Sequence, residues 1–167
     1  MRTAYYSFEG VEMSLADWQI SLISASVGTA IPLVLVIVRE MHLEKKRKQE
    51  VRNVLCSELL LAREALAESL KTGKLDEKDT NRLFVSAELP IHESFPLDTT
   101  FYDDIAIETL AKSVNMEALK NLQMSYNTIY RFNNKRLRVI GGFWTEKQTV
   151  TNLISNIEKT IRLITDC

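Results

Sequence analysis

Turn-forming and aromatic residues are scarce in this chain. Its 167 residues include five glycines and three prolines, and aromatic residues make up only 8%. A β-sandwich needs more turn formers than this, and collagen-like or low-complexity sequences contain far more glycine and proline. The length fits one domain. We therefore expect an all-α protein.

Cysteine and histidine are equally rare. Cys56 and Cys167 are too few for a disulfide framework or a four-ligand zinc site, which favours a reducing compartment. His42 lies in a charged stretch, and His92 lies beside Glu93 and Ser94, where adjacent side chains seldom point at the same atom. The sequence has no Walker-type phosphate loop, GxGxxG, CxxC or GxSxG motif. We predict no metal, no cofactor and no enzymatic activity.

Charge is nearly balanced over the whole chain. The 21 Lys and Arg residues against 22 Asp and Glu residues give a formal net charge of -1. A protein that binds the phosphate backbone of double-stranded nucleic acid usually has a larger excess of basic residues. We therefore expect no double-stranded nucleic acid partner, although individual segments are strongly charged.

One segment lacks charge altogether. Residues 18–38 read WQISLISASVGTAIPLVLVIV, and a helix of this length covers the hydrocarbon core of a bilayer. The alternative is a buried core helix of a soluble protein. Residues 1–17 are mainly acidic and residues 39–52 mainly basic, so the positive-inside rule places the C-terminal part in the cytoplasm. We predict a single pass through the inner (cytoplasmic) membrane, with a short extracytoplasmic tail at 1–17.

Small and hydroxyl residues gather along one side of the predicted span. On a helical wheel this side includes Ser21, Ser24, Gly28 and Pro32. Lipid gives no reason for such segregation, whereas close helix packing does, so we predict a homo-oligomer embedded in membrane lipid. The alternative is that the hydroxyls bond to their own helix and Pro32 is merely tolerated.

The rest of the chain is predicted to be a stalk helix and a cytoplasmic helical bundle. The stalk covers 39–73 and ends at Gly73, a residue suited to helix termination, and the cytoplasmic helical domain covers 74–167. Residues 83–85 fit either a short strand or an apolar plug. Further helices are expected from Asp98 or Thr99 to Ser113, after a cap at Asn115, and from a Thr145–Gln148 capping box to the C-terminus.

The segment 131–144, RFNNKRLRVIGGFW, combines basic, glycine and aromatic residues without an acid. Arginines donate to phosphates, glycines allow close backbone approach, and aromatic rings stack on bases. The alternative is a polar turn whose aromatic residues are buried. The candidate ligand-binding residues are Arg131, Asn134, Lys135, Arg136, Arg138, Phe143 and Trp144.

This order of segments resembles the small single-pass membrane effectors of bacterial phage defence. It is similar in layout to the membrane effectors of type III CRISPR systems that sense cyclic oligoadenylate. The resemblance implies a homotetramer with a cyclic oligonucleotide ligand, whose binding perturbs or opens the membrane in antiviral defence. The alternatives are a membrane-anchored adaptor that docks a protein partner and a constitutive pore subunit.

Overall fold

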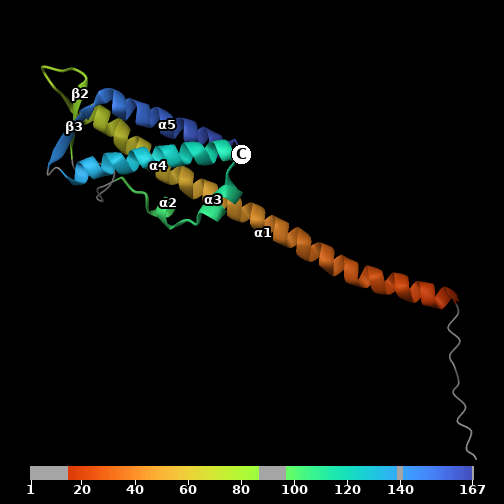
Figure 1. Cartoon of the computed structure of the whole chain (residues 1–167). Coiled ribbons are helices and arrows are strands. Elements are labelled where there is room, and N and C mark those ends of the chain that lie inside the picture. Colours follow the sequence, from red (N-terminus) through yellow and green to blue (C-terminus); the bar gives the residue numbers. More distant parts are fainter. Residues whose placement is uncertain (1–14, 87–96, 139–140, 167) are drawn as a thin grey trace, which may run out of the picture. The chain divides into compact units, whose positions relative to one another are not determined.

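The computed structural model describes the backbone of residues 15–86, 97–138 and 141–166 (Figure 1). Side chains are described from residue 30 onward within these ranges, except at residue 137. The chain divides into two compact units, residues 1–45 and residues 46–167. The boundary falls inside the first helix, α1 (Leu15–Thr72), so the predicted span and stalk lie on one helix.

In the first unit, α1 displays a run of exposed apolar residues. Ile31 and Leu33 to Val38 are 47–64% exposed. Among the residues whose side chains are described, no helix is long and apolar enough to cross a membrane. Residues 18–29 of the predicted span, with Ser21, Ser24 and Gly28, lie outside those residues, as does the predicted tail up to residue 14. Pro32 lies within the helix and is exposed.

The second unit is a mainly helical domain, as predicted. It contains the end of α1, α2 (Thr100–Asp104), α3 (Ile107–Ser113), α4 (Met116–Leu137) and α5 (Lys147–Thr165). Apolar residues at steps of three or four fall on one face of a helix, and these faces form a single core. Its fully buried members include Leu55, Leu59 and Leu66 on α1, Leu122 and Ile129 on α4, and Val150, Ile157 and Ile164 on α5.

A small sheet corrects the all-α prediction. The strands β1 (Lys74–Leu75), β2 (Arg82–Ser86) and β3 (Gly142–Glu146) form an antiparallel sheet in the order β1-β2-β3. Leu83 and Val85 pair with Thr145 and Phe143, and all four are buried. Side chains alternate across a sheet, so Phe84 and its partner Trp144 lie on the other face. Of the two alternatives left open for residues 83–85, a short strand or an apolar plug, the structure has the strand. The residues of β3 were expected to be a loop and a helix start.

Two predicted helix boundaries are wrong for tertiary reasons. The expected helix 98–113 breaks at Ile105 and Ala106, which are extended. Ile105 packs on the core and Leu110 is buried, but an unbroken helix would point them about 140° apart. The predicted capping box fails because Thr145 belongs to β3. The helix α5 therefore begins at Lys147, with no side-chain cap from Glu146.

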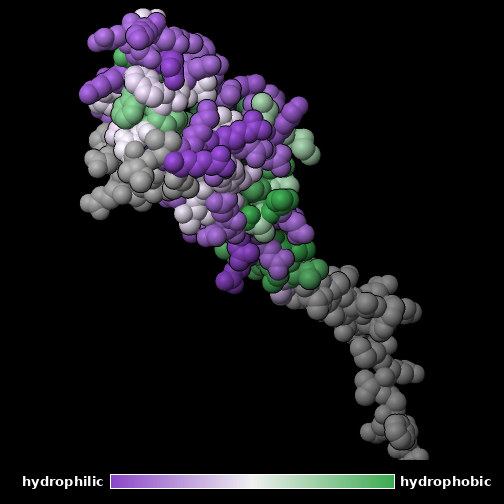
Figure 2. Space-filling model, turned by 60° about the vertical axis from the view of Figure 1, so that its left-hand side comes forward, coloured by the Kyte–Doolittle hydropathy of each residue, from purple (hydrophilic) through white to green (hydrophobic). Residues whose placement is uncertain are grey.

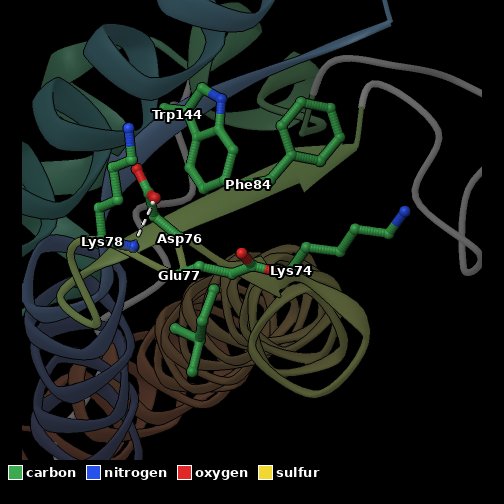
Figure 3. Close-up of a pocket in the computed structure, with 7 residues that line it drawn as sticks. Lys74, Asp76, Glu77, Lys78, Phe84 and Trp144 are labelled. Atoms are coloured by element: carbon green, nitrogen blue, oxygen red, sulfur yellow. Dashed lines mark hydrogen bonds between the residues drawn. The ribbon is translucent and has the colours of Figure 1, made fainter.

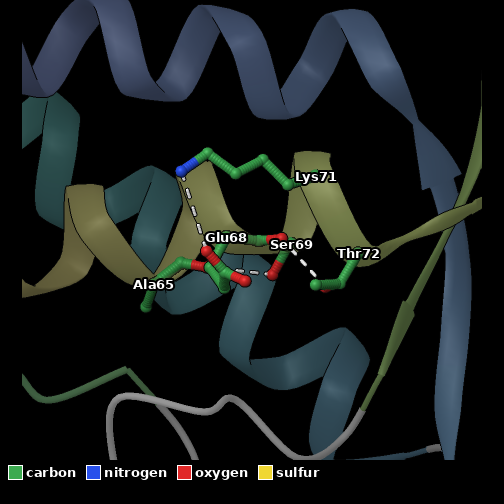
Figure 4. A network of polar contacts seen from close by, with 5 residues as sticks. All are labelled: Ala65, Glu68, Ser69, Lys71 and Thr72. Atoms are coloured by element: carbon green, nitrogen blue, oxygen red, sulfur yellow. Dashed lines mark hydrogen bonds and ion pairs between the residues drawn. The ribbon is translucent and has the colours of Figure 1, made fainter.

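Two predicted helix ends are confirmed. The side chain of Asn115 accepts a hydrogen bond from the Ala118 backbone N–H at 2.7 Å and caps α4. The helix α1 ends before Gly73. A Cβ on residue 73 would lie 2.4 Å from the Ser69 carbonyl oxygen and 2.6 Å from Leu83 Cδ1, so a larger residue does not fit there without a shift. In the last turns of α1, the Ser69 and Thr72 hydroxyls donate to the carbonyls of Ala65 and Glu68 (Figure 4). The buried hydroxyl of Ser69 therefore has a hydrogen-bond partner.

Candidate functional site

The structure divides the predicted binding segment between two elements. The helix α4 continues to Leu137, so its last turns carry Arg131, Asn134, Lys135 and Arg136. Arg138 is the residue that follows the helix, and Phe143 and Trp144 belong to β3. The segment is therefore a helix end and a strand, and not one continuous loop.

Arg131 and Lys135 lie on the same side of α4, because residues four apart on a helix are neighbours. Both are exposed, and both line a hollow of about 220 Å³ between α4, β3 and α5. Three threonines and two apolar residues complete its lining: Thr128, Phe132, Thr145, Thr149 and Leu153. This hollow combines two cations with three hydroxyl groups, and no acid is among its described lining residues.

A second hollow, of about 380 Å³, has a more mixed lining. It shares Lys135, Thr145 and Thr149 with the first hollow, so the two adjoin. Its other lining residues are Asp79, Asn81, Arg82, Trp144 and Glu146. We call the first the basic hollow, the second the mixed hollow, and the pair the α4–α5 groove.

The mixed hollow is organised around Trp144, which is 43% exposed. The guanidinium of Arg82 lies over the indole at 5.7 Å from the ring centroid, and it also pairs with Asp76 at 3.6 Å. Asp79 Oδ1 accepts a hydrogen bond from the backbone N–H of Asn81 at 3.0 Å, which shapes the turn between β1 and β2. The aromatic face and the charged groups are thus held by the sheet.

The other predicted binding residues have different environments. Arg136 is 1% exposed, and its Nη2 donates to the Ser86 carbonyl at 3.1 Å. Burial lowers the pKa of Arg136 to about 10. Phe143 is buried and packs edge-on against Phe132 at 5.3 Å. Asn134 and Arg138 are exposed and are not among the described lining residues of either hollow.

Of the twelve described residues that line the groove, the sequence-based list of binding residues contained three, Arg131, Lys135 and Trp144. Asp79, Asn81 and Arg82 come from a turn more than 40 positions before α4 ends, and nothing in their local pattern marks them as a site. Thr145 was considered only as a helix cap, and Thr149 was not singled out. Because Thr145 lies on β3 and Thr149 on α5, their spacing of four in the sequence is not a helical signal.

Trp144 also lines a wider hollow of about 670 Å³ (Figure 3). The rings of Phe84 and Trp144 lie side by side there, 5.5 Å apart in a T-shaped arrangement. Two lysines and two acids, Lys74, Asp76, Glu77 and Lys78, surround them. These charges balance, so this hollow favours no ligand charge, in contrast to the basic hollow.

The groove has the chemistry of a binding site. Cations, hydroxyls and an aromatic face are groups that can hold an anion with a planar group. In the part of the chain that the structure describes, no three His, Cys, Asp or Glu residues gather as a metal site. His42 is exposed, Cys56 packs against the core with its pKa raised by burial, and His92 lies outside the described residues.

Comparison with known proteins adds no family to this picture. The chain matches no protein-family model, and neither a curated protein nor a solved structure is significantly similar to it. The geometry of the groove and the pattern of the sequence therefore carry the functional argument.

Proposed function

We propose that this protein is an oligomeric, membrane-anchored receptor whose helical domain binds a nucleotide. The observation that carries the proposal is the α4–α5 groove. Arg131 and Lys135 line one hollow with Thr145 and Thr149, and Lys135 and the two threonines also line the adjoining hollow with Trp144. Guanidinium and ammonium groups bind phosphates, and an indole stacks on a base.

The start of α5 adds to the attraction for phosphate. This 19-residue helix begins at Lys147, and Thr145, Glu146 and Thr149 around its first turn all line the groove. The backbone N–H groups at a helix N-terminus carry a partial positive charge that favours anions. The first of them, at Lys147, donates to the Asn81 carbonyl at 2.7 Å, so any contact with an anion comes from those that follow it. Arg131, Lys135 and this helix end therefore favour the same ligand charge.

The uncharged segment 18–38 and the basic segment 39–52 support the membrane anchor. The same helix, α1, then contributes Leu55, Leu59 and Leu66 to the core that α4 and α5 complete. A ligand that binds one arrangement of this core more tightly shifts the population toward it, and α1 carries the change to the span. The proposed output is a perturbed or opened membrane, in antiviral defence.

Nucleotide binding is tested on the detergent-solubilised full chain. Replacing Arg131 with glutamine (Arg131→Gln) should weaken binding about tenfold. A charge-assisted hydrogen bond to phosphate contributes roughly 1.5–3 kcal/mol, and an exposed arginine contributes at the low end of this range because water competes for it. Isothermal titration with linear and cyclic nucleotides measures the change.

The matched control is Arg138→Gln, which removes the same charge from an exposed residue outside the described lining of the groove. It should leave the affinity within about twofold, which is roughly 0.4 kcal/mol. Equal losses in the two variants would show nonspecific attraction and contradict the site. An absence of binding across the nucleotide panel would refute the receptor proposal.

The anchor is tested independently of the ligand. After cell lysis without detergent, the full chain should sediment with membranes and resist extraction by alkaline carbonate, because insertion of an uncharged, mainly apolar helix of this length is essentially irreversible. Recovery of the chain from the aqueous fraction would disprove the anchor and leave the groove unaffected.

A further inference from the structure

The α4–α5 groove is asymmetric in charge along its length. The basic hollow contains Arg131 and Lys135 and has no acid among its described lining residues. The mixed hollow contains Asp79 and Glu146 together with Arg82 and Lys135. A phosphate is repelled by carboxylates, whereas the hydroxyl and amino groups of a nucleoside donate hydrogen bonds to them. The two hollows therefore differ in the part of a nucleotide that each can accept.

We infer that a 5′-nucleotide binds in one orientation, with its phosphates in the basic hollow and its nucleoside in the mixed hollow. This inference rests on the proposed nucleotide-binding function and specifies which group recognises which part of the ligand. Lys135, Thr145 and Thr149 line both hollows, so they lie at the junction where the ribose meets the first phosphate.

The aromatic contact comes from Trp144. It is the exposed aromatic residue of the mixed hollow, and Phe84, its partner on the neighbouring strand, packs edge-on against it on the same face of the sheet. Arg82 already lies near the indole, so a base that stacks there also meets a guanidinium plane. Stacking of a base on an aromatic side chain contributes about 1–3 kcal/mol.

The phosphate contact comes from Arg131 on α4 and Thr149 on α5, whose side chains both line the basic hollow. Arginine offers a fork of donors to phosphate oxygens, and the Thr149 hydroxyl adds one donor. Thr128 also lines this hollow, but its hydroxyl donates to the Met124 carbonyl at 2.9 Å. Volumes of about 220 and 380 Å³ together are within the usual range for small-molecule sites.

The orientation is tested with ADP, adenosine and inorganic pyrophosphate. Trp144→Leu should weaken ADP binding about tenfold and leave pyrophosphate binding within about twofold, because only the nucleoside part contacts the indole. Arg131→Gln should weaken ADP and pyrophosphate alike. Trp144→Phe, which keeps an aromatic face on the strand, should restore most of the ADP affinity and so separates stacking from damage to the sheet.

Fluorescence provides a second readout. The chain has two tryptophans, so Trp18→Phe leaves Trp144 as the single reporter. Bound ADP should quench this emission, whereas pyrophosphate at a saturating concentration should not.

ADP binding that depends on Arg131 but neither depends on Trp144 nor quenches it would overturn the orientation and leave the proposed function standing. Equal losses of ADP and pyrophosphate affinity in Trp144→Leu would overturn it as well. Failure of ADP and of the whole nucleotide panel to bind would overturn both proposals.

Discussion

Gly142→Ala is expected to lower the free energy of unfolding by about 3 kcal/mol, the largest effect that we predict for a single methyl group. Gly142 opens β3 with φ +128°, a backbone conformation that L side chains rarely adopt. An added Cβ would lie 2.4 Å from the Val85 carbonyl and 2.7 Å from the Phe84 ring. The first of these contacts is with backbone, so β2 and β3 must separate. Denaturant titration monitored by circular dichroism measures the loss.

Gly141→Ala is the matched control. Its φ is +85°, but no atom lies within 4 Å of the added Cβ. The variant therefore carries only the left-handed backbone cost of about 1 kcal/mol. Losses of equal size at the two glycines would show that the close approach to Val85 does not matter. The glycine pair was predicted to leave room for a phosphate, whereas the structure uses Gly142 to bring two strands together.

Tyr126→Phe is expected to lower the free energy of unfolding by about 2 kcal/mol at neutral pH. Tyr126 is 1% exposed, and its hydroxyl donates to Glu58 Oε2 at 2.7 Å. Glu58 is 7% exposed on α1, and the same oxygen accepts the Tyr102 backbone N–H at 3.3 Å. The variant would leave a buried carboxylate with one of these two hydrogen bonds lost. Chemical denaturation compares the free energies of unfolding.

Tyr130→Phe provides the comparison, because the Tyr130 hydroxyl donates to Asp103, which is exposed and accessible to water. Loss of this exposed hydrogen bond should lower the free energy of unfolding by less than about 1 kcal/mol. If both variants lost the same amount, burial of the Glu58 carboxylate would not be the reason for the Tyr126 effect.

The same carboxylate predicts a pH dependence. Burial raises the pKa of Glu58, and the hydrogen bond from Tyr126 only partly opposes this shift. The folded state therefore holds the Glu58 proton to higher pH than the unfolded state does. The contribution of Glu58 to the free energy of unfolding is therefore fully present below the pKa that Glu58 has in the unfolded state. It is lost as the pH rises through the higher pKa that Glu58 has in the folded state. Glu58→Gln should flatten this part of the stability profile, whereas exposed Glu64→Gln on the same helix should retain it.

Local patterns in the sequence were enough to predict the helical domain. The side chains of Leu122, Tyr126 and Ile129 recur at steps of three or four, and their burial follows from helix geometry alone. Asn115 and Gly73 mark helix ends through hydrogen bonds to residues within four positions. Each of these features depends on neighbours in the chain, so the sequence contains the whole interaction.

The candidate site needed contacts between distant parts of the chain. Of the predicted residues, Arg131, Lys135 and Trp144 line the groove. They were predicted because their residue types suit an anion with a planar group. Arg136 has the same chemistry but is buried against the Ser86 carbonyl, a distinction that composition cannot make.

The sequence by itself determined that the domain is mainly helical, which faces of α4 and α5 are buried and which segment is uncharged, because helical hydrogen bonds and side-chain periodicity act over three or four residues. Only the tertiary structure decided that β2 pairs with β3, that Glu58 meets Tyr126, and that the turn at 79–82 completes the groove. These contacts join segments tens of residues apart, and their free energy depends on a packing arrangement that no local pattern specifies.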